Sequence, residues 1–251
     1  MDVIGPGATY YVVDLATMED SERRRLFDEV HQQILMPAFP SNEMTPLGVL
    51  QQMWAGAPPR LAVHAALDSR GQPVGCAVAQ WFPRSTVLLF AYLAVRVDWR
   101  GGGIGTSLIT RAVRAWAAAY RPALVLAEVE DPRVYPCTPD QDPLARLRLY
   151  ARLGARLLEL RYVQPEVSPG AGRVRDLLLL VAQKCSAGVV SASSEVVGVP
   201  AAVVLAFLDE YYRDSEGEAH RDAEFLAMVR PLTNRDVVPL SSIHAWEAKH
   251  R

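Results

Sequence analysis

The sequence is short of lysine, cysteine and long apolar runs, and it has no excess of positive charge. Of its 26 basic residues only two, Lys184 and Lys249, are lysine, which we interpret as the codon bias of a GC-rich, bacterial genome. The net charge of −2 excludes the overall positive field with which proteins bind nucleic acid or an anionic membrane nonspecifically. Any site for an anion must therefore be local.

The cysteines and the apolar runs exclude further classes of protein. Cys76, Cys137 and Cys185 are odd in number and have no CxxC spacing, which predicts neither a disulfide framework nor a zinc knuckle and favours a reducing, cytoplasmic location. The longest apolar run, residues 196–208, contains Pro200 and is shorter than the ~20 residues that span a bilayer. No basic region precedes an apolar stretch at the N-terminus, so we expect neither a secretory signal nor a membrane partner.

The pattern of the first 185 residues predicts an α+β fold with a mixed, mostly antiparallel sheet and flanking helices. Half of the 251 residues are hydrophobic and 22% are charged, as in an ordinary soluble globular protein. Thr45 and Asp142 stand where helix N-caps are expected, and Gly154 stands where a helix ends. Strands are predicted at residues 9–15, 60–68, 73–82, 86–97, 123–130, 155–163 and 175–182, and helices at 21–35, 46–54, 106–119 and 142–153.

The character of the chain changes at residue 186. Residues 186–194 are small and polar and predict a linker, and residues 200–212 and 218–229 predict two amphipathic helices. The segment 186–251 holds ten acids and six bases, a net charge of −4, whereas residues 1–185 have a net charge of +2. We therefore expect a main domain at 1–185 and a helical C-terminal extension at 186–251. Residues 200–229 of the extension are expected to cover the cleft and mediate a homodimer.

A glycine-rich loop lies between a predicted strand and a predicted helix. Its sequence is Arg100, Gly101, Gly102, Gly103, Ile104 and Gly105, followed by Thr106. Backbone N–H groups converge at a helix N-terminus, where the helix dipole is positive, and glycine lets an anion approach them closely. Neither a P-loop nor a dinucleotide fingerprint matches, because Gly105 is followed by Thr106, Ser107 and Leu108. The loop by itself is equally compatible with a tight turn that binds nothing.

The longer sequence around the loop decides between an anion site and a tight turn. The sequence LAVRVDWRGGGIGTSL at residues 93–108 resembles motif A of the GNAT superfamily of N-acetyltransferases, whose pattern Arg/Gln-x-x-Gly-x-Gly/Ala is matched by Arg100, Gly103 and Gly105. The sequence LYARLG at residues 149–154 is similar to the motif B helix of that family, with Tyr150 and Gly154 in the expected places. Residues 9–183 are compatible with the family's fold, which implies two splayed central strands.

The resemblance implies a donor and the residues that bind it. The donor is acetyl-CoA or another acyl-CoA, with its pyrophosphate on the N–H groups of residues 101–106 and its pantetheine beside the backbone of Val95 and Val97. The acyl carbonyl is polarised by an N–H group near residues 93–95. The sequence departs from the family at Pro143, where many members have an asparagine that contacts pantetheine.

The resemblance also implies which residues donate a proton, accept a proton and bind the acceptor. Tyr150 matches the usual proton donor to the departing thiolate, although its helix position alone would also suit a packing residue. Glu128 and Glu130 lie on one side of a predicted strand, where Glu128 is a candidate base and Glu130 a candidate for binding the acceptor. Glu43, between the first two helices, is a second candidate for acceptor binding.

We therefore expect an N-acyltransferase that acts on an amine of a small molecule or a peptide by direct attack in a ternary complex. The alternative is a non-catalytic acyl-CoA-binding sensor or interaction module. The five histidines occur singly, with no i, i+4 pair and no nearby cysteine, so we expect no metal. We also expect no nucleic-acid partner.

Overall fold

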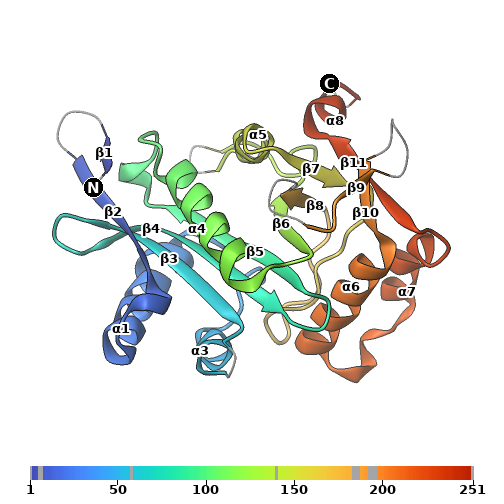
Figure 1. The fold of residues 1–251 in the computed structure, drawn as a ribbon, viewed down its shortest axis with the longest axis horizontal. Coiled ribbons are helices and arrows are strands. Elements are labelled where there is room, and N and C mark those ends of the chain that lie inside the picture. The colour runs from blue at the N-terminus through green and yellow to red at the C-terminus, as the bar shows by residue number, and fades with distance from the viewer. Residues whose placement is uncertain are drawn as a thin grey trace. The chain divides into compact units, whose positions relative to one another are not determined.

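The computed structural model describes residues 2–4, 8–56, 59–138, 141–182, 187–191 and 197–249. The chain forms two compact units: unit 1 comprises Met1–Trp81 and Phe90–Ala119, and unit 2 comprises Phe82–Leu89 and Tyr120–Arg251. The fold is α+β, with mostly antiparallel strands flanked by helices, which confirms the predicted class (Figure 1). No helix in the described ranges is long and apolar enough to cross a membrane.

The strands of unit 1 follow one another in chain order, β1-β2-β3-β4-β5. The β1/β2, β2/β3 and β3/β4 pairs are antiparallel. The last strand is divided, because its residues 87–89 belong to unit 2 and its residues 90–95 to unit 1. The strands span Asp2–Ile4 (β1), Ala8–Asp14 (β2), Leu61–Asp68 (β3), Pro73–Phe82 (β4) and Val87–Val95 (β5).

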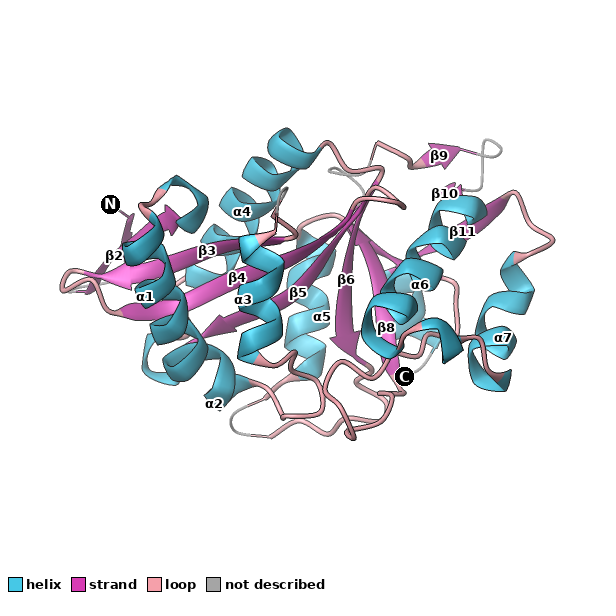
Figure 2. Ribbon diagram, turned by 90° about the horizontal axis from the view of Figure 1, so that it is seen from below, coloured by secondary structure: helices cyan, strands magenta, loops and turns pink. Residues whose placement is uncertain are grey.

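Helices cover both faces of the sheet of unit 1 (Figure 2). Because side chains alternate along a strand, Leu61, Val63 and Ala65 of β3 join the core beneath α1 and α3, while His64 faces α4 and contacts Trp116, with ring centroids 5.4 Å apart. The helical segments are η1 (Leu15–Thr17), α1 (Asp20–Val30), the π-helical η2 (His31–Leu35), α2 (Met36–Ala38), α3 (Leu47–Ala55), η3 (Val97–Trp99) and α4 (Ile104–Tyr120).

One predicted helix cap of unit 1 is wrong. The N-cap of α3 is Pro46, which makes no side-chain capping bond. Thr45 instead points to β5, where its N–H donates to Tyr92 Oη at 2.9 Å. A threonine before a proline has the sequence pattern of a cap, but the buried tyrosine hydroxyl offers Thr45 a partner that sequence spacing does not reveal.

The strands of unit 2 run in the order β6-β8-β7-β11-β10-β9, and each neighbouring pair is antiparallel. The start of β5 lies beside β6, since Ala123 N–H donates to Thr86 O at 2.8 Å. The strand predicted at 155–163 ends at Leu158. The strands span Leu124–Glu130 (β6), Ala155–Leu158 (β7), Leu177–Ala182 (β8), Val190–Ser191 (β9), Val197–Pro200 (β10) and Val237–Ser242 (β11).

The main core of unit 2 lies between its sheet and α6. Leu124 and Leu126 of β6 and Leu179 of β8 pack with Phe207 and Leu208 of α6. Helix α5 lies on the other face of the sheet (Figure 2). The helical segments are α5 (Pro143–Arg152), α6 (Ala201–Glu216), η5 (Glu218–His220), α7 (Ala223–Val229), η6 (Arg230–Leu232) and α8 (Ile243–Lys249).

The C-terminal extension is not purely helical. Both predicted helices are present as α6 and α7, but β10 and β11 also form, and β11 pairs with β7 on one side and β10 on the other. Residues 197–249 therefore complete the sheet of unit 2. The domain boundary at residue 186 stays a prediction, and Cys185, Ser186 and residues 192–194 of the expected linker lie outside the described residues.

Candidate active site

The glycine-rich loop of unit 1 connects β5 to α4 through η3. Gly101 and Gly103 have φ angles of +83° and +80°, a left-handed conformation in which a side chain is strained. A Cβ at either position would stand in open space, with no atom within 4 Å. The Arg100 side chain turns back, and its Nε donates to Val95 O at 3.0 Å. The loop therefore presents bare backbone to its surroundings.

In the described part of the chain, Arg100 N–H donates to Val97 O at 3.2 Å, whereas the N–H groups at the start of α4 lie ahead of its first helical bond. The first helical bond of α4 runs from Ser107 N–H to Gly103 O at 3.0 Å, so the N–H groups of Ile104, Gly105 and Thr106 precede it. Gly101, Gly103 and Thr106 are exposed, and Gly102 and Gly105 are half-buried. Such a set of donors at the positive end of a 17-residue helix suits a diphosphate.

The two valines expected beside pantetheine differ in their setting. Val95 is the last residue of β5. Val97 lies beyond the strand in η3, and its side chain is 61% exposed. The expectation that the strand continues to Val97 is wrong, because the bidentate pair of Arg96 with Asp98, at 2.7 and 2.9 Å, accompanies a tight turn there.

Glu43 also belongs to unit 1, in the loop before α3. Its carbonyl oxygen accepts from Tyr92 Oη at 3.3 Å, and the same hydroxyl donates to Thr45 Oγ1 at 3.2 Å. Tyr92 thus fixes the loop that carries Glu43. Sequence reasoning missed this role, since the two residues are 49 positions apart.

Tyr150 belongs to unit 2, on α5. Asp142 caps this helix, as predicted, by accepting from Ala145 N–H at 2.8 Å, and Gly154 ends it with a φ of +81°. The Tyr150 side chain is 7% exposed. Burial raises the pKa of Tyr150 above that of a free phenol, with a smaller opposing effect of the Arg146 guanidinium, so the hydroxyl stays protonated at neutral pH.

Glu128 and Glu130 lie at the end of β6, and each carboxylate is bound by a different partner. Glu128 accepts from Tyr162 Oη and, at 2.8 Å, from Gln164 Nε2. Glu130 is 6% exposed and pairs with Arg146 of α5 at 3.1 Å. Arg146 thus connects the end of β6 to the helix that carries Tyr150. Tyr162, Gln164 and Arg146 are functional candidates that sequence reasoning missed, because no local pattern links them to β6.

The candidate residues are therefore divided between the units. Unit 1 holds Glu43, Val95, Val97 and the loop 100–106, and unit 2 holds Glu128, Glu130 and Tyr150. Within unit 2, Arg146 brings Glu130 and α5 together, while Glu128 belongs to a separate cluster with Tyr162 and Gln164.

Two surface hollows lie away from these residues. One of about 460 Å³ lies between α1 and α3 of unit 1, lined by residues that include Arg23, Arg24 and Trp54. The other, about 500 Å³, lies around Arg173 in unit 2. Among the residues that the structure describes, no group of three or more His, Cys, Asp or Glu side chains could hold a metal ion.

Comparison with known proteins finds a family match for part of the chain. Residues 59–154 match the family model described as Acetyltransferase (GNAT) domain. No curated protein matches the chain in sequence.

Three similar solved structures are bacterial. A candidate GNAT-family acetyltransferase from Bacteroides thetaiotaomicron is 19% identical, with a TM-score of 0.46 over 69% of this chain and 85% of that chain. The ribosomal-protein-S18-alanine N-acetyltransferase from Escherichia coli is 16% identical, with a TM-score of 0.45 over 69% and 92%. A GNAT family acetyltransferase from Elizabethkingia anophelis, solved with acetyl-CoA bound, is 16% identical, with a TM-score of 0.41 over 70% and 97%. Residues 59–154 thus match a GNAT acetyltransferase domain, which agrees with the resemblance found in the sequence.

Proposed function

We propose that the protein transfers an acetyl or other acyl group from acyl-CoA to an amine of a small molecule or a peptide. The observation that carries this proposal is the open glycine loop at the start of α4, inside the segment that matches the GNAT domain. The loop residues suit acyl-CoA, because the two left-handed glycines leave room for a phosphate beside the free N–H groups.

The residues have distinct roles in this proposal. The N–H groups of residues 101–106 bind the pyrophosphate, and Val95 and Val97 lie along pantetheine. Glu43 and Glu130 recognise a cationic or polar acceptor. Glu128 takes the proton of the attacking amine, directly or through a water molecule, and Tyr150 protonates the departing thiolate.

The reaction is a direct transfer in a ternary complex. The neutral amine nitrogen attacks the thioester carbonyl, the new C–N bond forms and the C–S bond breaks. One proton leaves the nitrogen to Glu128, and one proton passes from Tyr150 to the thiolate, which leaves as CoA thiol. The raised pKa of Tyr150 makes its proton transfer less favourable than that from a free phenol, by about 1.4 kcal/mol for each pKa unit. The nearby Arg146 guanidinium stabilises the phenolate that forms.

Calorimetry with CoA and an assay for thiol release over a panel of amines test the proposal. Tyr150→Phe should leave CoA binding unchanged and lower turnover by about 10²-fold or more, the contribution typical of a general acid. Tyr135→Phe is a matched control, since it removes a hydroxyl of the same unit that donates to Arg175 O at 3.5 Å and has no role in the proposed reaction. Absence of CoA binding would contradict the proposal, and CoA binding without thiol release on any amine would instead favour a binding module.

The expected homodimer and the separate extension remain proposals. Light scattering on the full chain tests the dimer directly. A monomer at micromolar concentration would contradict it.

A further inference from the structure

The segment 162–164 of unit 2 binds both carboxylate oxygens of Glu128. Tyr162 Oη donates to Oε1, and Gln164 Nε2 donates to Oε2 at 2.8 Å. Both donors are buried, with side chains only 3% and 5% exposed. Burial, with the neighbouring Glu128 carboxylate as a second cause, raises the pKa of Tyr162, so its hydroxyl remains a donor. The position of the Glu128 carboxylate therefore depends on where this segment lies.

The C-terminal part of the chain holds the segment by its backbone. Tyr212 Oη, on α6, donates to Val163 O at 2.8 Å, and Val163 N–H donates to the sulfur of Met228, on α7, at 3.4 Å. The next residue, Gln164, exchanges two backbone hydrogen bonds with Val174, at 2.9 and 3.2 Å. The two polar backbone groups of Val163 are thus bound by two helices that lie far from it in sequence.

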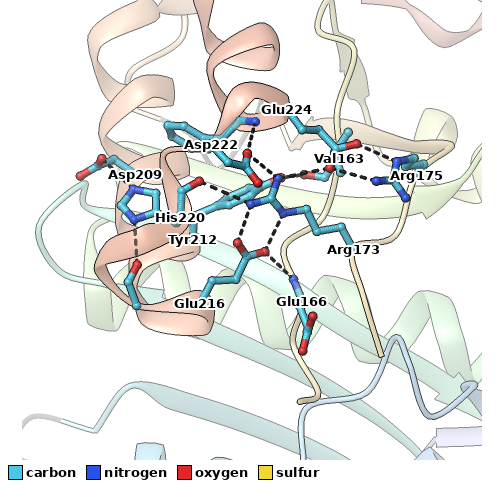
Figure 3. Close-up of polar contacts among 12 residues, drawn as sticks. Val163, Glu166, Arg173, Arg175, Asp209, Tyr212, Glu216, His220, Asp222 and Glu224 are labelled. Carbon is cyan, nitrogen blue, oxygen red and sulfur yellow. Dashed lines mark hydrogen bonds and ion pairs between the residues drawn. The ribbon is translucent and has the colours of Figure 1, made fainter. Parts of the chain in front are cut away.

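Tyr212 is itself fixed in place. Its side chain is fully buried, its ring centroid lies 4.8 Å from that of Phe225, and the Arg173 guanidinium lies over the ring at 4.9 Å (Figure 3). Arg173 is held by two bonds to Glu216, at 2.8 and 2.6 Å, and by Asp222 at 2.9 Å. The hydroxyl of Tyr212 is therefore a rigid donor at the end of a packed helix.

We propose that Tyr212 is a positioning residue for Glu128. Its hydroxyl fixes the carbonyl of Val163, which stands in the sequence between Tyr162 and Gln164, the two residues whose side chains bind the Glu128 carboxylate. This proposal rests on the proposed role of Glu128 as the base. A base must be within hydrogen-bond reach of the proton it takes, and a misplacement of about 1 Å can cost 10²-fold in rate. The C-terminal extension thereby contributes to catalysis without touching the substrate.

Tyr212→Phe is the direct test, because it keeps the ring and removes only the hydroxyl. We expect kcat to fall about tenfold, with the KM for acyl-CoA unchanged, since acyl-CoA binding does not involve Glu128. In the Glu128→Gln background the same substitution should cause no further loss, because the two residues act through one another. An equal loss in both backgrounds would overturn the proposal.

Two further variants separate positioning from general loss of structure. Val204→Ala removes buried methyl groups from the same helix and should lower the melting temperature without changing kcat below it. Met228→Leu removes the sulfur acceptor of Val163 and should change kcat in the same direction as Tyr212→Phe. If Val204→Ala and Tyr212→Phe lower kcat equally, the role of Tyr212 is structural and the proposal fails.

A spectroscopic readout keeps the test independent of turnover. The ¹³C NMR signal of the Glu128 carboxylate, identified by its loss in Glu128→Gln, should move in Tyr212→Phe and not in Val204→Ala. An unchanged signal would overturn the positioning role even if the wild-type protein transferred no acyl group. Conversely, a moved signal with a kcat that Glu128→Gln leaves unchanged would support the positioning and refute the role of Glu128 as base.

Discussion

Glu210, on α6, accepts two hydrogen bonds from Ser85, one from its N–H at 2.8 Å and one from its hydroxyl at 2.9 Å. The other carboxylate oxygen accepts from Arg84 N–H at 3.2 Å. Glu210 is 3% exposed, and Ser85 precedes it by 125 residues, in the turn between β4 and β5. This contact joins the segment 82–89 to α6 within unit 2, where Phe82, Val87 and Leu89 also share its core.

Replacing Glu210 should destabilise unit 2. Glu210→Ala leaves the buried donors of Ser85 without their acceptor, so we expect the free energy of unfolding to fall by about 3 kcal/mol. Glu210→Gln retains an acceptor oxygen and should cost less. Urea unfolding measures both, and equal midpoints for Glu210→Ala and the wild-type protein would contradict the role of this contact.

Removing the guanidinium of Arg173 should produce a loss of stability that depends on pH. Arg173 holds the pKa of Asp222 below its usual range, and Arg175, with a smaller contribution from Arg173, does so for Glu224. A lowered folded-state pKa contributes stability above the unfolded pKa of about 4, and that stability is lost as the pH falls through the folded-state value.

We therefore expect Arg173→Gln to lower the free energy of unfolding by about 3–5 kcal/mol at pH 7, mainly because it leaves Glu216 partly buried without its cation. The difference from the wild-type protein should shrink below about pH 4, where Asp222 and Glu224 become protonated. Because Asp222 is 52% exposed, its own share should be small. Urea unfolding at pH 7 and pH 3 tests this, and a difference independent of pH would contradict it.

Gly103→Ala should weaken CoA binding more than it weakens the fold. The φ angle of +80° makes alanine strained by about 1–2 kcal/mol, and the new methyl group would stand in the open space where the phosphate is proposed to bind. Loss of one charge-assisted hydrogen bond corresponds to about a tenfold or greater rise in Kd. The matched control is Gly71→Ala, at a φ of +75° in the turn between β3 and β4 of the same unit. Calorimetry that gave both variants the same Kd would refute the site.

Gly198→Ala should disrupt the C-terminal strands. A Cβ on Gly198 would collide with Val237 Cγ1 and would lie 2.6 Å from the backbone oxygen of Val238, on the paired strand β11. Because a backbone atom cannot move away cheaply, we expect a loss of about 3 kcal/mol in unfolding free energy. Gly48→Ala, where nothing lies within 4 Å on the exposed side of α3, should instead stabilise by about 0.5–1 kcal/mol. Thermal unfolding in which Gly198→Ala matched the wild-type protein would show that β10 does not pack this closely.

Most elements of the first 185 residues could be predicted because their signals are local. The cap at Asp142, the left-handed Gly154 and the alternating strands β3 and β4 each follow from residues within a few positions of one another. The C-terminal extension was predicted less completely, because its strands β10 and β11 were not expected. Strand β11 contains Pro239, which argues against a strand with partners on both sides, yet it pairs with β7 and β10.

By itself, the sequence determined the glycine loop, the α5 helix that carries Tyr150 and the resemblance to GNAT acetyltransferases. These depend on backbone conformations and spacings that neighbouring residues impose. Only the tertiary structure decided which groups surround each carboxylate. An example is the series of contacts in which Tyr212 binds Val163 and the neighbouring Tyr162 binds Glu128. Contacts of this kind join residues that are 34 to 125 positions apart in the sequence. Polar groups that are buried together in one core must find hydrogen-bond partners there, and no local pattern of the chain encodes which partners these are.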